Sequence, residues 1–267
     1  MKNLITIIAL FCCLTTVVAQ PGRGMTAPFP ISNLKEIGIK GRVKEITEYT
    51  YFKSIGEDEV DTLKKPYKTV STFDALGNEL TETKYTPKGI VISKLMFDYS
   101  QKQQVIVNQF GYNDQLANKL ILTYDDRGLL MESVQYTPPI SAPVFKITFK
   151  YDEKGNEKER MLYFSNGQLA ERTIFSYNDK NQKTESNSTA FMANQTIKTT
   201  FSYNRGNLAK EEVSTNGSLI SSITKIDYNK FDQHGNWLLE VYLSNIGKGL
   251  LSGIQDKKII RRTILYY

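Results

Sequence analysis

The chain has 267 residues, of which 40% are hydrophobic and 23% charged, and its formal net charge is +6 at pH 7. A chain of this length and composition can bury a globular core without help from disulfides. Its basic and acidic residues are interspersed, apart from the pairs Lys257-Lys258 and Arg261-Arg262. Proteins that bind nucleic acids concentrate basic residues in a patch, so we expect no nucleic-acid partner.

Residues 1–19 have the pattern of a signal peptide. Lys2 precedes an apolar run from Leu4 to Val18, and Ala19 closes the run with a small residue of the kind that a signal peptidase reads. The run is shorter than a membrane-spanning helix requires. We therefore expect an exported protein, periplasmic or extracellular, that does not span a membrane.

Both cysteines of the chain, Cys12 and Cys13, lie within this predicted signal peptide. They follow Phe11 and Cys12, whereas lipid attachment calls for a small residue before the cysteine, so we expect a cleaved signal without lipidation. The remaining residues contain no thiol. This excludes a disulfide, a thiol nucleophile and a thiolate metal site.

Residues 20–38 predict an irregular linker, because they combine Gly22, Gly24, Pro28 and Pro30 with no hydrophobic periodicity. From residue 39 to residue 267, apolar and polar residues alternate in segment after segment. Alternation with a period of two predicts strands that have one buried face, and no segment shows a sustained helical pattern. We predict one β-repeat domain over residues 39–267.

A short phrase recurs about every 26 residues along this domain. An aromatic residue is followed by Asp or Asn, two or so polar residues, and Gly or Asn, as in Tyr151-Asp152-Glu153-Lys154-Gly155-Asn156. The aromatic residues that begin the phrase are Phe73, Phe97, Tyr124, Tyr151, Tyr177, Tyr203 and Phe231. A constant period in this range indicates a repeat architecture.

The repeated phrase predicts a hairpin turn. An Asp or Asn side chain can accept a hydrogen bond from the backbone amide two residues later, and the Gly or Asn near the end of the phrase tolerates a positive φ. The aromatic residue is then the last inward residue of the incoming strand. Further turn signals lie between the phrases, at residues 86–89, 137–139, 166–167 and 216–217. Each repeat is therefore predicted to hold two antiparallel strands.

Seven such repeats predict an all-β fold, an antiparallel meander of about 14 strands. Laid flat, these strands would span roughly 65 Å. Sheets this wide usually curl, split or close, and their apolar face must be covered. We predict a curled sheet or an irregular barrel. A transmembrane barrel is disfavoured, because the polar face of the strands carries many Lys and Glu residues and the sequence shows no lipid-facing band.

The phrase from Tyr151 to Asn156 resembles the YD repeat of the Rhs family, and the resemblance covers about residues 73–240. In that family such repeats build curved β-sheet shells, often around a toxic C-terminal domain, and carbohydrate binding has been proposed for some members. We expect no toxin domain here. The closing residues around Trp237 also resemble small exported proteins of unassigned function from Gram-negative bacteria. The resemblance implies an architecture and export, not an activity.

The sequence predicts no catalytic residue, metal ligand or cofactor. His234 is the only histidine, and it occupies a turn position that Leu76, Arg127 or Lys154 fills in other repeats. Alone it cannot build a zinc site. Four aspartates recur at equivalent places, which predicts turn capping rather than catalysis; they are Asp74, Asp125, Asp152 and Asp232. A catalytic pair of carboxylates that includes Glu132 or Glu159 is left as an alternative by the sequence.

The hypothesis that the protein binds a ligand rests on its aromatic residues. The chain has 16 Tyr, 13 Phe and one Trp, and tyrosines at repeated positions could stack on sugars. The same rings could instead close the edge of the core. We single out Tyr99, Tyr112 and Trp237 as candidate ligand-binding residues.

We expect a non-catalytic, exported β-repeat module that binds or scaffolds in the bacterial envelope, with a glycan or an envelope protein as its partner. One alternative is a carboxylate-dependent, polysaccharide-cleaving enzyme, which predicts two acidic residues about 5–10 Å apart and a raised pKa on one of them. The other alternative is a subunit of a larger envelope assembly, which predicts an exposed apolar face or an unpaired edge strand.

Overall fold

The structure is a computed structural model that describes residues 34, 38–53, 66–204, 209–217, 219–246 and 254–267. The predicted signal peptide, residues 1–19, lies outside the described residues. The predicted linker, residues 20–38, also lies outside them, apart from Leu34 and Gly38. Among the described residues, no helix is both long and apolar enough to cross a membrane.

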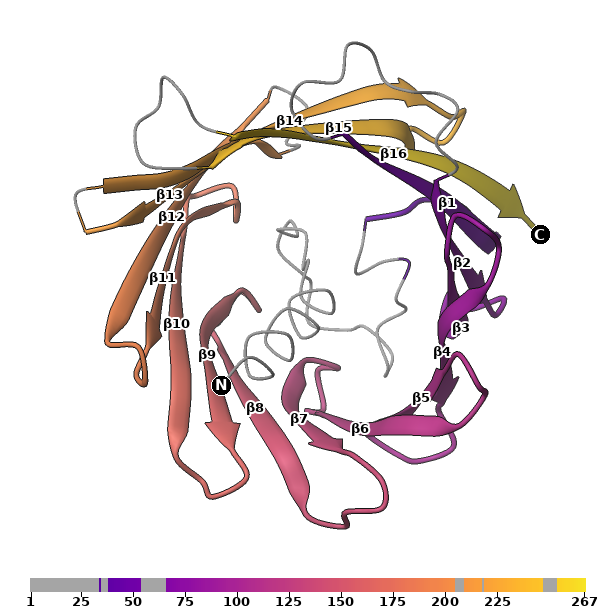
Figure 1. The fold of residues 1–267 in the computed structure, drawn as a ribbon, viewed down its shortest axis with the longest axis horizontal. Helices are drawn as coiled ribbons and strands as arrows, with labels where there is room; N and C mark the ends of the chain where they lie inside the picture. Colours follow the sequence, from indigo (N-terminus) through magenta and orange to yellow (C-terminus); the bar gives the residue numbers. More distant parts are fainter. Residues whose placement is uncertain (1–33, 35–37, 54–65, 205–208, 218, 247–253) are drawn as a thin grey trace.

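Sixteen antiparallel strands form one closed barrel, and they follow the order of the chain around its wall (Figure 1). β1 pairs with β16, so the described wall has no open edge. The strands are β1 (Val43–Lys53), β2 (Tyr67–Phe73), β3 (Glu79–Tyr85), β4 (Val91–Asp98), β5 (Gln104–Gly111), β6 (Leu116–Tyr124), β7 (Leu130–Tyr136), β8 (Pro143–Tyr151), β9 (Glu157–Phe164), β10 (Leu169–Tyr177), β11 (Lys183–Ala190), β12 (Gln195–Tyr203), β13 (Ala209–Asn216), β14 (Leu219–Phe231), β15 (Trp237–Ile246) and β16 (Ile254–Tyr266).

The predicted all-β antiparallel meander is confirmed, and the barrel is the form observed. The predicted count of about 14 strands is too low. The seven repeated phrases connect β2 to β3, β4 to β5 and so on to β14 and β15, so one further strand remains at each end. These two strands, β1 and β16, pair with each other and close the wall. The first strand begins at Val43, and Ile39 ahead of it belongs to a buried cluster.

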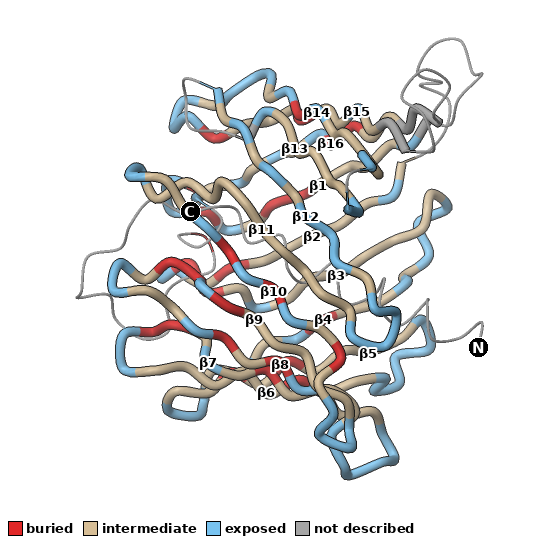
Figure 2. Tube along the Cα trace, turned by 90° about the vertical axis from the view of Figure 1, so that its left-hand side faces the viewer, coloured by how far each residue is buried: buried red, intermediate tan, exposed pale blue. Residues whose placement is uncertain are grey.

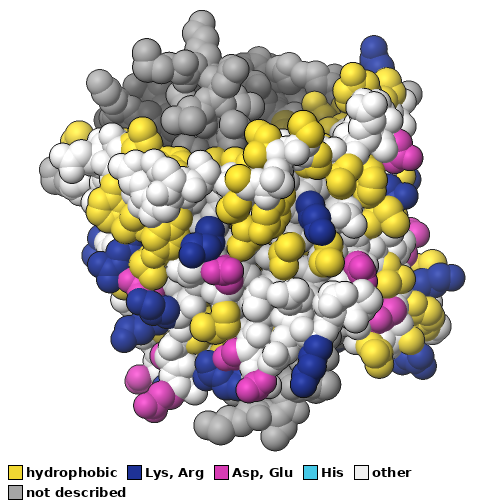
Figure 3. Space-filling view, turned by 90° about the horizontal axis from the view of Figure 1, so that it is seen from below, with side chains coloured by type: hydrophobic (Ala, Val, Ile, Leu, Met, Phe, Trp, Pro, Cys, Tyr) yellow, Lys and Arg dark blue, Asp and Glu magenta, His cyan; other side chains and the backbone are white. Residues whose placement is uncertain are grey.

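The two faces of the wall differ in burial, which identifies the inner face. On β8, Ile147 and Phe149 are buried, whereas Lys146 and Lys150 on the opposite face are exposed. Figure 2 shows buried residues along the strands and exposed residues at the turns. Figure 3 shows that the outer wall carries Lys, Arg, Asp and Glu side chains among hydrophobic ones.

The core is spread along the inner face. Sixteen strands about 4.8 Å apart and tilted by about 40° enclose a barrel roughly 30 Å in diameter, too wide for opposite side chains to meet. Buried side chains therefore form separate clusters on the wall. One contains Leu34, Ile39, Val43, Ile46 and Phe73. A second contains Leu95, Val105, Val107 and Leu120.

The repeated phrase forms the turns at one end of the barrel. In the turn that begins at Phe73, the amide of Gly77 donates to the carbonyl oxygen of Asp74 (3.0 Å), and Gly77 has a φ of +88°. The Asp74 carboxylate accepts hydrogen bonds from the amides of Leu76 (2.8 Å) and Asn78 (2.9 Å). The other three aspartates accept equivalent bonds. The predicted turn-capping role is confirmed.

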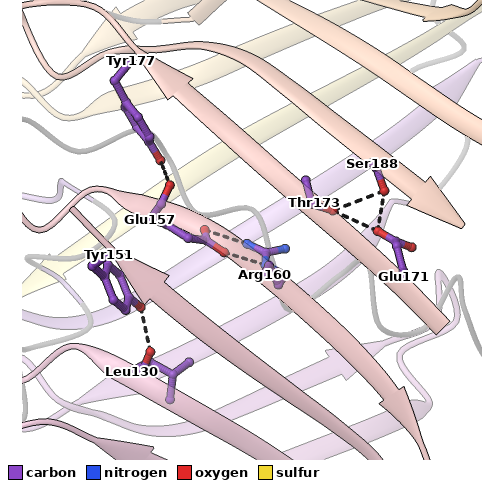
Figure 4. Close-up of polar contacts among 8 residues, drawn as sticks. All are labelled: Leu130, Tyr151, Glu157, Arg160, Glu171, Thr173, Tyr177 and Ser188. Carbon is purple, nitrogen blue, oxygen red and sulfur yellow. Dashed lines mark hydrogen bonds and ion pairs between the residues drawn. The ribbon is translucent and has the colours of Figure 1, made fainter. Parts of the chain in front are cut away.

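Tyrosines of four of the phrases tie their repeat to the one before it. The hydroxyl of Tyr177 donates to the carbonyl oxygen of Glu157 (2.8 Å), and that of Tyr151 donates to the carbonyl oxygen of Leu130 (2.8 Å), as Figure 4 shows. Tyr99 and Tyr203 make the same kind of bond. In each case the acceptor is the first residue of the strand that follows the preceding turn. Each bond stabilises the stacking of neighbouring repeats by about 1 kcal/mol.

The last phrase departs from the pattern. Phe231 was predicted to be the last inward residue of its strand, but its side chain is 50% exposed and is not part of the buried core. Lys230 adopts a positive φ of 57°, which interrupts the alternation of side chains just before it. The inward aromatic residue here is Tyr228, whose ring lies 5.9 Å from that of Trp237.

Asn236 connects the segment before β1 to the end of β16, where the barrel closes. Its Nδ2 donates to the carbonyl oxygen of Lys40 (2.9 Å) and to the hydroxyl of Tyr266 (2.9 Å), and its Oδ1 accepts from the amide of Lys40 (2.8 Å). The Tyr266 hydroxyl also donates to the Asp232 carboxylate. A Cβ at Gly41 would lie 2.7 Å from the Tyr266 ring, so the seam requires glycine there.

We predict that Asn236→Ala lowers the free energy of unfolding by about 2–3 kcal/mol, because it removes several partly buried hydrogen bonds at once. Asn78→Ala is the matched control, since Asn78 bonds to Asp74 of its own turn, and it should cost about 1 kcal/mol. Urea unfolding followed by circular dichroism measures both. Equal losses would contradict the role of Asn236 in closure.

Candidate functional site: the inner wall of the barrel

The inner face changes in character along the barrel axis. Toward the turns of the repeated phrase it carries buried apolar residues such as Val107, Ile147 and Phe175. Toward the other end, amides, hydroxyls and a carboxylate recur on this face, and we call them the inner polar belt. Its members, placed on the same face by their cross-strand partners, are Gln109, Asn118, Gln135, Glu171, Thr173, Ser188, Thr199, Ser214, Thr224 and Ser244. The Phe145–Phe164 pair interrupts the belt between β7 and β10.

Asn118 on β6 is the centre of the belt on one side of the barrel. Its Nδ2 donates to Oε1 of Gln109 (2.9 Å), and its Oδ1 accepts from Nε2 of Gln135 (3.0 Å) and from the hydroxyl of Thr137 (2.7 Å). These bonds cross three neighbouring strands. The amides are thereby held in fixed orientations on a surface that remains half-buried.

Glu171 is the centre of the belt on β10 and β11 (Figure 4). Its Oε1 accepts from the hydroxyls of Ser188 (2.6 Å) and Thr173 (3.1 Å). The belt continues through the hydroxyl pairs Thr199–Ser214 and Thr224–Ser244, each 2.9 Å apart. A surface of hydroxyls, amides and a carboxylate offers donors and acceptors to a ligand rich in hydroxyl groups.

A cation–aromatic row lies nearer the turns of the repeated phrase. It consists of Phe149, Arg160, Phe175, Lys183 and Phe201. The Arg160 guanidinium lies 5.6 Å from the Phe149 ring centroid and 5.4 Å from that of Phe175, and Lys183 Nζ lies 4.2 Å from the Phe175 centroid and 5.9 Å from that of Phe201.

The row is packed, not open. Phe149 and Phe175 are buried, and Arg160 makes two hydrogen bonds to Glu157 (2.7 and 2.9 Å). Burial lowers the pKa of Lys183, which the nearby Glu157 carboxylate opposes. We interpret the row as a layer that stiffens the wall beside the belt.

A second group of charged and aromatic residues spans β14, β15, β16 and β1. The Arg262 guanidinium lies 3.5 Å from the ring centroid of Trp237 and 2.7 Å from Oε1 of Glu48. Burial raises the pKa of Glu240 above its ordinary value, while hydrogen bonds from Tyr242 and Tyr228 oppose the shift. Trp237 is thus held by a cation from the neighbouring strand.

Glu79 is a carboxyl whose pKa burial strongly raises. It begins β3, and burial raises its pKa to about 8, with a further rise from the negative charge of Glu82. A hydrogen bond from Ser71 and the charge of Lys84 act in the opposite direction. A carboxyl that keeps its proton near neutral pH can act as a general acid.

The three predicted binding residues do not meet. Tyr99 is half-buried and its hydroxyl donates to the carbonyl oxygen of Glu79 (2.9 Å), so it ties two repeats together. Tyr112 is exposed at the turn between β5 and β6. Trp237 lies beside Arg262 and Tyr228.

The carboxylates that the sequence left open, Glu132 and Glu159, lie on the outer face and pair with cations. Glu132 Oε2 is 3.8 Å from Lys146 Nζ. Glu159 lies 2.6 Å from Lys150 Nζ and 2.5 Å from Arg172 Nε, and hydrogen bonds from these two cations lower its pKa. Both are therefore ordinary ion pairs across strands.

His234 lies in an exposed turn, where its ring is 4.5 Å from that of Tyr266 and its amide donates to Asp232 (2.8 Å). Within the part of the chain that the structure describes, no three His, Cys, Asp or Glu side chains group closely enough to hold a metal ion.

The inner polar belt was missed by sequence reasoning. Its signal is present: Ser186 and Ser188 alternate with Asn187 and Thr189 in β11, and all are polar. Because such a strand has no apolar side, its sequence does not show which face is inward.

The fold resembles that of a crystal structure of a porin-like protein from Bacteroides uniformis, with a TM-score of 0.60 and 11% identity over 84% of this chain and 98% of that chain. A TcdB2-TccC3 structure has a TM-score of 0.30, covering 78% of this chain and 14% of that one. A Photorhabdus luminescens Tc holotoxin pore structure has a TM-score of 0.22. No family model matches the chain, and no curated protein matches it. The first similarity shows the fold alone.

We predict that Glu79→Gln flattens the dependence of stability on pH. The unfolded chain ionises this carboxyl near pH 4.5 and the folded chain near pH 8, so the wild type loses stability as the pH rises through that window. Between pH 5 and pH 8 the stability of the variant relative to the wild type should therefore rise by about 3–4 kcal/mol. Glu153→Gln, in an exposed turn, is the control. Parallel wild-type and Glu79→Gln profiles in urea unfolding would contradict the raised pKa.

Proposed function

We propose that the chain is a non-catalytic, exported barrel of the bacterial envelope whose inner polar belt binds a hydroxyl-rich ligand, a glycan. The observation that supports this most directly is the belt itself, with Asn118 and Glu171 held by hydrogen bonds on a half-buried inner surface. Sugar recognition relies on donors and acceptors fixed in this way. The likeness to a porin-like fold is compatible with an envelope location.

We further propose that the barrel does not span a membrane. Charged pairs lie across the outer wall, among them Lys150–Glu159–Arg172 and Lys198–Glu185. Charges on a lipid-facing wall are strongly unfavourable near the bilayer midplane. The outer face is therefore better suited to water than to hydrocarbon.

Glycan binding is tested with a glycan array and with calorimetry against envelope polysaccharides. Glu171→Gln should weaken binding about tenfold, since it removes a charged acceptor that also orients two hydroxyls. Glu185→Gln is the matched control, because Glu185 is on the neighbouring strand but faces outward beside Lys198. Absence of any glycan ligand, or equal effects of the two changes, would remove the proposal.

The second candidate function is a carboxylate-dependent, polysaccharide-cleaving enzyme. It is favoured by one observation, the pKa of Glu79 near 8 beside the charge of Glu82. It predicts that reducing ends appear when the protein is incubated with a polysaccharide, and that Glu79→Gln and Glu82→Gln each abolish their release. Release that survives both changes, or no release from any envelope polysaccharide, would eliminate it.

A further inference from the structure

The two ends of the barrel expose different side chains. At the end opposite the repeated phrase, the hairpins β3–β4, β5–β6, β7–β8, β11–β12 and β13–β14 each expose a large apolar or aromatic residue at or beside the turn. These residues, which we call the apolar rim, are between 59% and 80% exposed. They are Ile90, Tyr112, Ile140, Met192 and Leu219.

The turns of the repeated phrase expose charges instead. Their tips carry the exposed pairs Asp126-Arg127, Glu153-Lys154 and Asp179-Lys180. Exposed apolar residues at this end include Leu76 and, at the start of the last phrase, Phe231. Figure 3 shows the same polarity over one side of the barrel: hydrophobic side chains gather toward the upper end of the wall, and charged ones lie mainly over its middle and lower part.

A girdle of aromatic residues lies on the outer face just inside the apolar rim. Tyr85, Phe110, Tyr136 and Tyr163 occupy the ends of β3, β5, β7 and β9, and each has a lysine as its cross-strand partner. The partners are Lys68, Lys94, Lys119 and Lys146. Lys68 Nζ lies 5.2 Å from the Tyr85 ring centroid, and Lys146 Nζ lies 5.4 Å from that of Tyr163.

We propose that the apolar rim and this aromatic–lysine girdle dock the barrel end-on to the surface of an anionic lipid bilayer. A ring of hairpin tips can be contacted all at once by a flat surface. The tips lie two or three residues beyond the girdle, roughly 7–10 Å, which matches the depth to which interfacial segments bury their apolar side. Aromatic rings then reach the level of the headgroups, and the lysines extend to the phosphates.

Charge favours lipid over a second copy of the chain. The net charge of +6 attracts an anionic surface. In a dimer that packs the apolar rims of two copies against each other, both sets of girdle lysines would lie at one interface, where like charges repel. A lipid surface supplies the opposite charge to the same lysines.

The test is flotation of the full chain with vesicles of 70% phosphatidylcholine and 30% phosphatidylglycerol. The rim variant combines Tyr112→Ser, Ile140→Ser and Met192→Ser. The matched control combines Leu76→Ser, Phe231→Ser and Leu265→Ser, three exposed residues away from the rim. The rim variant should partition to vesicles at least about tenfold less than the wild type, while the control partitions like the wild type. Circular dichroism confirms that both variants fold.

A second pair of measurements separates lipid from protein as the occupant. Pure phosphatidylcholine vesicles, and Lys94→Gln with Lys119→Gln on the mixed vesicles, should both bind more weakly than the wild type on mixed vesicles. Wild-type protein that does not float, or two triple variants that float equally, would overturn the proposal. So would self-association in ultracentrifugation that only the rim variant loses, without any vesicle binding by the wild type.

Discussion

Closure of the sheet is the constraint on which the rest of the structure depends. A sheet of this width with free edges would expose unpaired backbone groups along its first and last strands. Pairing of β1 with β16 removes both edges, and the bonds of Asn236 to Lys40 and Tyr266 fix the seam. A closed wall of this width must then stabilise its inner face strand by strand, because no side chain reaches across.

That requirement explains the regular tyrosine bonds and the cation–aromatic row. The hydroxyls of Tyr99, Tyr151, Tyr177 and Tyr203 each bond to the start of a strand in the preceding repeat, so stability is distributed around the wall. The Arg160 and Lys183 side chains fill the space between phenylalanine rings of neighbouring strands. With this layer providing rigidity, the polar belt beside it can stay half-buried and available to a ligand.

Polar and apolar side chains are separated in two directions in this barrel: between the two faces of the wall and along the barrel axis. The inner face carries the polar belt toward one end and the buried apolar residues with the cation–aromatic row toward the other. The outer face carries ion pairs such as Lys198–Glu185. Along the axis, charged turns at one end stand opposite the apolar rim at the other. An inner surface for a polar ligand and an end surface for an anionic bilayer occupy different parts of the same wall, so the two proposals do not compete for residues.

The sequence by itself determined the all-β class, the antiparallel meander and the turn chemistry, because these depend on local rules: alternation with a period of two, and an aspartate beside a residue that tolerates positive φ, as at Asp74 and Gly77. The tertiary structure alone decided the rest. Three features depend on contacts between residues far apart in the chain: whether β1 meets β16, whether Phe231 is buried or exposed, and which side of a polar strand such as β11 lines the interior. Local periodicity carries no information about such contacts, so the belt around Asn118 and the rim around Tyr112 became visible only in the folded barrel.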